Sequence, residues 1–108
     1  MTLDLPRPVA SYLAAETARD PDMLARCFAD DALVHDEDHD YRGLDAIRSW
    51  KREVQAKYQY VMEPLGASVS EETVRLRVRL TGNFPGSPAE VTFTFTLAND
   101  KITALEIE

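Results

Sequence analysis

The hydrophobic repeat of this chain changes once, near Gln59, from the period of helices to the period of strands. In residues 74–81 apolar side chains alternate with arginines and one threonine, and in residues 91–97 they alternate with threonines. Upstream of Gln59 the apolar residues recur at three- and four-residue spacing, as on one face of a helix. Helices followed by a block of strands predict an α+β fold.

Three helices are predicted before the change of period. The first covers residues 8–18, with prolines in its first turn. The second begins at Asp20, an N-cap acid followed by Pro21, and ends near Asp30. A short strand over residues 32–35 and an acidic loop over 36–40 precede a third helix over 45–57. Its inner face carries Ile47, Trp50 and Val54.

Four longer strands follow, over residues 60–69, 74–81, 91–97 and 102–107. Asn99 and Asp100 predict a hairpin turn into the last strand, where Thr103, Leu105 and Ile107 are expected to face inward. The helices must then cover one face of a strongly curved antiparallel sheet, with a cone-shaped pocket between the layers.

Length and composition place limits on the function. A chain of 108 residues predicts a single domain over residues 1–108, and its net charge of −7 argues against nucleic-acid binding. No apolar run approaches the ~20 residues of a membrane span. Residues 1–6 lack the basic and apolar regions of a signal peptide, and the lone Cys27 fits a reducing cytoplasm. A cytoplasmic protein without membrane contact is therefore expected.

The acidic segment after the second helix holds both histidines, and it raises the question of a metal site. His35 and His39 are surrounded by carboxylates, which are ligands for zinc, iron or manganese. Their spacing spans a strand end and a loop rather than one helix face, and strand alternation sends His35 away from Asp36. A solvated charged loop is the simpler interpretation, and no metal is expected.

The element order and two motifs resemble those of a known superfamily. Residues 28–32 read FADDA and residues 41–48 read YRGLDAIR. With the helix and strand order, they resemble the nuclear transport factor 2-like superfamily, and most closely its SnoaL-like polyketide cyclase and ketosteroid isomerase branches. The resemblance covers essentially the whole chain. It is more specific for the fold than for an activity, because this fold hosts many functions.

The resemblance implies roles for two residues. In ketosteroid isomerases a tyrosine of the first helix donates a hydrogen bond to the substrate oxyanion, and an aspartate after the second helix moves the proton. Tyr12 and Asp36 match these positions. A second oxyanion donor of that family, a protonated aspartic acid, falls on or beside Val91, which is apolar, and Glu90 should point to the opposite face. This departure argues against steroid isomerisation in particular.

Other residues are candidates for the ligand pocket, each with a simpler alternative. Asp36 is either a desolvated acid–base group or the start of a solvated loop, and Tyr12 is either a donor or a core residue. Glu16 lies on the same helix face as Tyr12 and is either a pocket acid or a solvated end residue. The aromatic residues that could contact an apolar ligand, or simply fill the core, are Phe28, Trp50, Phe93 and Phe95.

Two hypotheses for the function follow. The first is a small enzyme without a cofactor that transfers a proton next to a carbonyl of an apolar small molecule, as an isomerase, cyclase or dehydratase. The second is a module of the same fold that binds a small ligand or assembles as a dimer without catalysis. In either case a homodimer through the outer sheet face is expected. That face carries Arg75, Arg77, Arg79, Thr92, Thr94 and Thr96.

Overall fold

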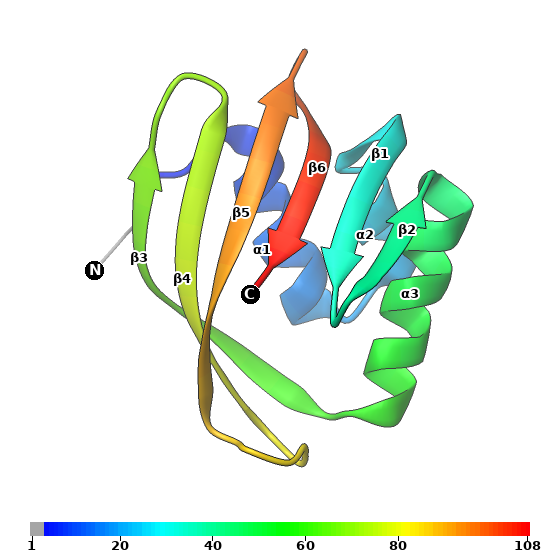
Figure 1. The fold of residues 1–108 in the computed structure, drawn as a ribbon, viewed down its shortest axis with the longest axis vertical. Coiled ribbons are helices and arrows are strands. Elements are labelled where there is room, and N and C mark those ends of the chain that lie inside the picture. The colour runs from blue at the N-terminus through cyan, green and yellow to red at the C-terminus, as the bar shows by residue number, and fades with distance from the viewer. Residues whose placement is uncertain (1–3) are drawn as a thin grey trace.

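The computed structural model describes residues 4–108, so the start of the N-terminal segment considered above lies outside the described residues. Within this range the chain forms a helical layer and one six-stranded sheet. In the view of Figure 1, α1 and α2 lie behind the sheet and α3 lies next to β2. This arrangement confirms the α+β prediction. The elements are α1 (Arg7–Ala18), α2 (Pro21–Ala25), β1 (Phe28–Asp36), β2 (His39–Arg42), α3 (Leu44–Lys57), β3 (Tyr60–Val69), β4 (Thr73–Gly82), β5 (Ala89–Ala98) and β6 (Lys101–Ile107).

The sheet is mixed rather than purely antiparallel, which corrects the sequence-based expectation. The strand order is β2-β1-β6-β5-β4-β3, and β1 pairs with β6 in parallel while the other neighbours are antiparallel. The last strand therefore inserts between β1 and β5. Parallel pairing requires a long connection, and here α3 and strands β2–β5 lie between the two paired strands in the chain.

Helix α2 is shorter than its apolar spacing predicted. Its start is as expected, because Asp20 Oδ1 accepts hydrogen bonds from the backbone N–H groups of Asp22 and Met23. The helix ends at Ala25 instead of near Asp30, and Phe28 already pairs with Ile102 in the sheet. The β1–β6 register shifts between Phe28 and Leu33, and this irregularity interrupts the alternation by which a strand is recognised in sequence.

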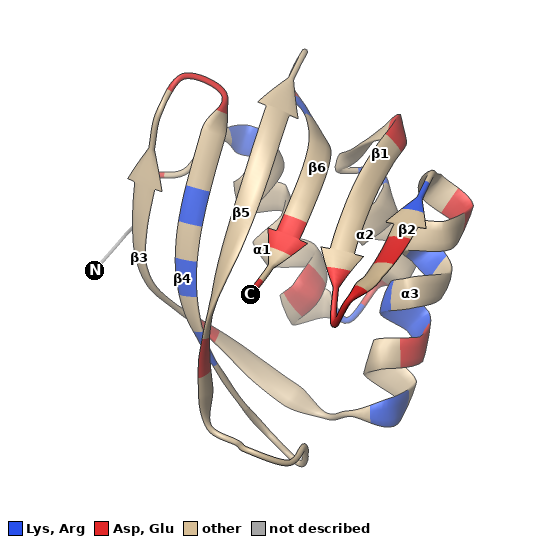
Figure 2. Ribbon diagram, viewed as in Figure 1, with Lys and Arg blue, Asp and Glu red and all other residues tan. Residues whose placement is uncertain are grey.

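The acidic segment after β1 is a tight hairpin rather than an open loop. Glu37 and Asp38 have φ values of 52° and 64°, closely similar to the 53° and 64° of Asn99 and Asp100 in the predicted β5–β6 turn. Both pairs have the positive φ values of a type I′ turn. Strand β2 was missed because the turn residues are Glu-Asp, which lack the Asn-Gly signature of such hairpins. Figure 2 shows the acids gathered at this turn.

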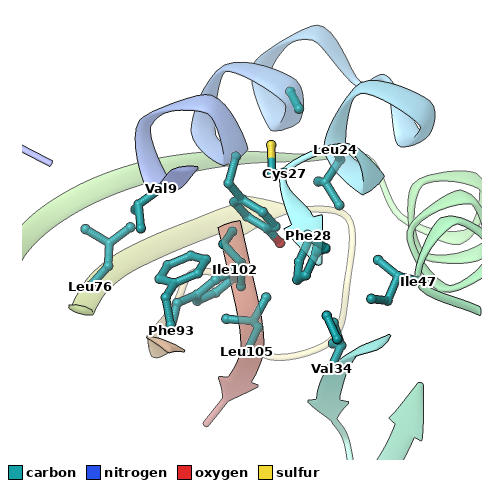
Figure 3. Close-up of a cluster of buried hydrophobic side chains, with 14 of the residues drawn as sticks. Val9, Leu24, Cys27, Phe28, Val34, Ile47, Leu76, Phe93, Ile102 and Leu105 are labelled. Atoms are coloured by element: carbon teal, nitrogen blue, oxygen red, sulfur yellow. The ribbon is translucent and has the colours of Figure 1, made fainter. Parts of the chain in front are cut away.

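The core lies between α1, α2, α3 and the inner sheet face (Figure 3). In β6 the buried residues are Ile102 and Leu105, whereas Thr103 is only half-buried and donates a hydrogen bond to the Thr96 carbonyl. Thr103 lies where the β5–β6 register shifts between Thr96 and Leu97, so the simple alternation used to place it does not hold there. Within residues 4–108, no helix is both long enough and apolar enough to cross a membrane.

Candidate active site

A cavity of about 560 Å³ opens between α3 and strands β3, β4 and β5. Its volume lies within the range of sites for small organic molecules. Most of its wall is apolar, and aromatic rings from α3 and from the β4–β5 loop contribute to it. The apolar and aromatic lining residues are Trp50, Val54, Tyr58, Tyr60, Met62, Leu80, Phe84, Pro85, Ala89, Val91, Phe93 and Ile107.

A buried polar network forms one part of the cavity wall. The Glu16 carboxylate accepts three hydrogen bonds: Oε2 from the Tyr12 hydroxyl at 3.0 Å and from Lys51 Nζ at 2.7 Å, and Oε1 from the Tyr60 hydroxyl at 2.8 Å. Burial, followed by the nearby Glu16 carboxylate, raises the pKa of both tyrosines, so both phenols remain protonated donors at neutral pH.

Lys51 is the cation of this network, and its side chain is only 3% exposed. Beyond Glu16, its ammonium makes a 3.4 Å contact with the Tyr60 hydroxyl. The nitrogen also lies 4.3 Å from the centre of the Trp50 ring, within the range of a cation–π interaction. An ammonium has three N–H donors, and among residues 4–108 the third finds no hydrogen-bond acceptor.

Asp36 is the second acidic group on the cavity wall, and it is half-buried at the end of β1. Its Oδ2 accepts a hydrogen bond of 3.0 Å from the Trp50 indole nitrogen. Trp50 therefore contacts both Asp36, through its N–H, and Lys51, through its ring. The other oxygen of Asp36 accepts no hydrogen bond from the described residues.

The structure divides the sequence-predicted candidates into two groups. Glu16, Asp36, Trp50 and Phe93 line the cavity. Tyr12 is fully buried in the core and is not among the lining residues, and its hydroxyl is directed at Glu16. The aromatic candidates that pack edge-on against the Tyr12 ring are Phe28, Phe93 and Phe95, of which Phe28 and Phe95 do not line the cavity.

Val91 and Glu90 of β5 lie on opposite faces of the sheet. Val91 lines the cavity as an apolar residue. Glu90 is exposed, and it accepts a hydrogen bond from Arg79 Nη2 at 3.2 Å on the outer side of the sheet. The wall at Val91 therefore supplies no hydrogen-bond donor from a side chain.

The two histidines lie apart from the cavity lining. His35 Nδ1 and Asp40 Oδ1 are 2.6 Å apart across the β1–β2 hairpin, and this hydrogen bond raises the pKa of His35. His39 is exposed. Among residues 4–108, no cluster of three or more His, Cys, Asp or Glu side chains could hold a metal ion.

Sequence reasoning missed Lys51 and Tyr60, although one signal for Lys51 was present. Lys51 follows Ile47 by four positions, so the helical period places it on the same inner face as Trp50. A charged residue on an apolar face needs a partner, and Glu16 was the unmatched acid on the first helix. Tyr60 carried no comparable signal, because a tyrosine at a strand start is common.

The comparisons with known proteins identify the family. The model of the SnoaL-like domain matches residues 9–105, nearly the whole chain. This chain belongs to the SnoaL-like family. No functionally curated protein matches the sequence.

Solved structures agree with this SnoaL-like assignment. A Sinorhizobium meliloti protein, provisionally described as a polyketide cyclase, is 38% identical, with 97% of this chain and 96% of that chain covered and a TM-score of 0.94. A Catenulispora acidiphila protein with a ketosteroid isomerase-like fold, crystallised with trimethylamine, is 21% identical over 97% and 86% of the two chains, with a TM-score of 0.85. A nuclear transport factor 2-like protein from Cytophaga hutchinsonii is 15% identical over 99% and 91%, with a TM-score of 0.75. The last two similarities concern the fold alone.

Proposed function

We propose that this SnoaL-like protein is an enzyme that transfers a proton next to a carbonyl group of an apolar small molecule, in an isomerase, cyclase or dehydratase type of reaction, without a cofactor. One observation carries the proposal: the Asp36 carboxylate lies on the wall of a largely apolar cavity of about 560 Å³. A carboxylate held beside a bound carbonyl compound is a suitable general base for a carbon-bound proton.

Asp36 would accept the proton, and Trp50 would fix its orientation. The indole N–H binds one carboxylate oxygen and leaves the other available to the ligand. The aromatic and aliphatic wall would hold a flat apolar molecule and keep water away from the reacting carbon. The same residue can return the proton at another carbon, which is an isomerisation, or assist the loss of a hydroxyl group.

Tyr12 enters the proposal in a modified role. Its hydroxyl donates to Glu16 and lies behind the cavity wall, so we propose that it acts as a positioning residue through Glu16. Glu16 in turn holds Lys51 and Tyr60, both of which line the cavity.

The alternative function is a binding module of the same fold. The binding module is favoured by the apolar side chain of Val91 on the cavity wall. The resemblance to ketosteroid isomerases would place the second donor to the substrate oxyanion at this position. A cavity that only sequesters an apolar ligand needs no donor there and no acid–base group.

Deuterium exchange distinguishes the two functions. In D2O, the protein should accelerate deuterium incorporation next to the carbonyl of at least one member of a panel of apolar cyclic diketones and aryl ketones, followed by NMR. Asp36→Asn should lower that rate by about 10²–10⁴-fold, because the amide cannot accept the proton.

Asp40→Asn is the matched control: the same change in the same hairpin, at an acid that pairs with His35 outside the cavity lining. It should exchange like wild type. Exchange that is unaffected by Asp36→Asn would refute the proposed base.

We also propose that the protein is cytoplasmic, because its free, buried Cys27 fits a reducing compartment. We further propose that it forms a homodimer through the outer sheet face. On that face Arg75 and Arg77 are exposed and form no salt bridge with the described residues, whereas Arg79 pairs with Glu63 and Glu90. Figure 2 shows these basic positions along β4. Elution as a monomer at micromolar concentration in gel filtration would contradict the dimer.

A further inference from the structure

Lys51 is buried in a way that packing alone does not require. A buried ion pair loses the hydration of both charges, and replacement by apolar residues is often neutral or stabilising. Yet Glu16 and Lys51 are each 3% exposed in their side chains, and both line the cavity. Their position at the cavity wall suggests that the cation serves a ligand.

Lys51 lines the cavity, and its ammonium has one strong hydrogen bond, to Glu16 at 2.7 Å. The contact with the Tyr60 hydroxyl is long, at 3.4 Å, and the Trp50 ring is a cation–π partner rather than a hydrogen-bond acceptor with a lone pair. Among the described residues, no oxygen accepts the third N–H of this ammonium. A ligand oxygen is the partner that such a donor fits.

We propose that the Lys51 ammonium binds an oxygen atom of the ligand. The ligand would then be an apolar molecule that carries one enolisable carbonyl or acidic hydroxyl group at the end that contacts Trp50. This inference rests on the proposed function and adds the group that would stabilise the developing negative charge. Trp50 sets the geometry, since its N–H holds Asp36 while its ring contacts Lys51. The carbon that loses a proton would lie beside Asp36 and the oxygen that gains charge would lie toward Lys51, both on the same side of Trp50.

The charges balance in such a step. Asp36 accepts the proton as the carbon–hydrogen bond breaks, and the electron pair of that bond moves onto the carbonyl oxygen as an enolate. The charged side chains on the cavity wall are the carboxylates of Glu16, Asp36, Glu37 and Glu108 and the ammonium of Lys51. Afterwards Asp36 is neutral and the oxygen carries its charge, so the net charge of the cavity is unchanged. Lys51 would stabilise the charge at its new position.

The test uses planar naphthols of graded acidity as enolate mimics, with binding followed by fluorescence of the single Trp50. In wild type the affinity should rise with the acidity of the naphthol. Lys51→Met should lower the affinity for the most acidic naphthol about tenfold or more and remove the dependence on acidity, because a charge-assisted hydrogen bond is lost. Lys57→Met is the matched control, an exposed lysine of the same helix outside the cavity lining, and it should bind like wild type.

A second variant covers the case in which Lys51→Met does not fold. Glu16→Gln combined with Lys51→Met removes both charges of the pair, and it should fold and show the same loss of acidity dependence. Affinity that is independent of acidity in wild type, or acidity dependence that persists in the folded Lys51 variants, would overturn the inference.

The result can be separated from that of the exchange assay. Deuterium exchange that needs Asp36 but tolerates Lys51→Met would keep the proposed function and refute the role of Lys51. Acidity-dependent binding through Lys51 without any exchange would refute catalysis and leave Lys51 as the oxygen-binding residue of a binding module.

Discussion

Trp50 connects the polar groups of the cavity at the scale of single residues. Its N–H donates to Asp36, and its ring contacts the Lys51 ammonium and lies 6.0 Å from the Tyr41 ring. A tryptophan with so many partners has little rotational freedom, so the Asp36 carboxylate is held in one orientation. Precise orientation of a base relative to its substrate contributes strongly to the rate of a proton transfer.

His35 provides a pH-dependent prediction at the same scale. The hydrogen bond to Asp40 raises the pKa of His35 in the folded state, while partial desolvation opposes this effect. The resulting stabilisation is therefore fully present below about pH 6.5, the ordinary value, and is lost as the pH rises through the higher pKa of the folded protein. NMR titration should give a His35 midpoint above the ordinary value, and Asp40→Asn should lower it. A midpoint that does not move in Asp40→Asn would contradict the assignment.

At the scale of elements, the start of β3 and the end of β4 meet beside the polar network. Gly82 pairs with Tyr60, and the backbone N–H of Asn83 donates to the Gln59 carbonyl. A Cβ atom at position 82 would lie 2.1 Å from the Gln59 carbonyl oxygen and 2.8 Å from Tyr60 Cα. Both are backbone atoms, so the strands would have to separate at the residue that bonds to Glu16.

Gly82→Ala should therefore destabilise the protein by about 1–3 kcal/mol, measured by urea unfolding, and weaken naphthol binding through displacement of Tyr60. Gly66→Ala is the matched control within the same pair of strands, since nothing lies within 4 Å of a Cβ atom there. It should unfold close to wild type. Equal unfolding curves for the two variants would show that β3 and β4 can separate at Gly82 without cost.

At the scale of the whole molecule, the sequence predicted a helical layer packed on a sheet, but it did not predict the pairing of the first and last strands. The alternation of residues 74–81 predicted the body of β4, because regular alternation is a local signal. The parallel pairing of β1 with β6 joins segments that are far apart in the chain, and local periodicity does not report such contacts. Phe28 was assigned to a helix for this reason, since only its pairing with Ile102 shows that it belongs to a strand.

The candidate site was predictable in the same partial way. Asp36, Glu16 and Trp50 were candidates from the sequence and line the cavity. The sequence left two positions open for Tyr12, a pocket donor or a core residue. It could not decide between them, because the position depends on how the Glu16 carboxylate is shared among three donors from α1, α3 and β3. Shared hydrogen bonds between distant segments are a property of the folded molecule.

The measurement that tests most directly whether a ligand binds beside Asp36 is NMR observation of the Trp50 indole N–H, which is unique because the chain has one tryptophan. On addition of 2-naphthol this resonance should shift saturably and show magnetisation transfer to the ligand protons. In Asp36→Asn the chemical shift of the indole N–H without ligand should differ from that of wild type, because the carboxylate that accepts its hydrogen bond is replaced. Binding of 2-naphthol with no change at the Trp50 indole would place the ligand elsewhere, such as the smaller pocket beside Pro8 and Leu97. That result would contradict a reaction at Asp36.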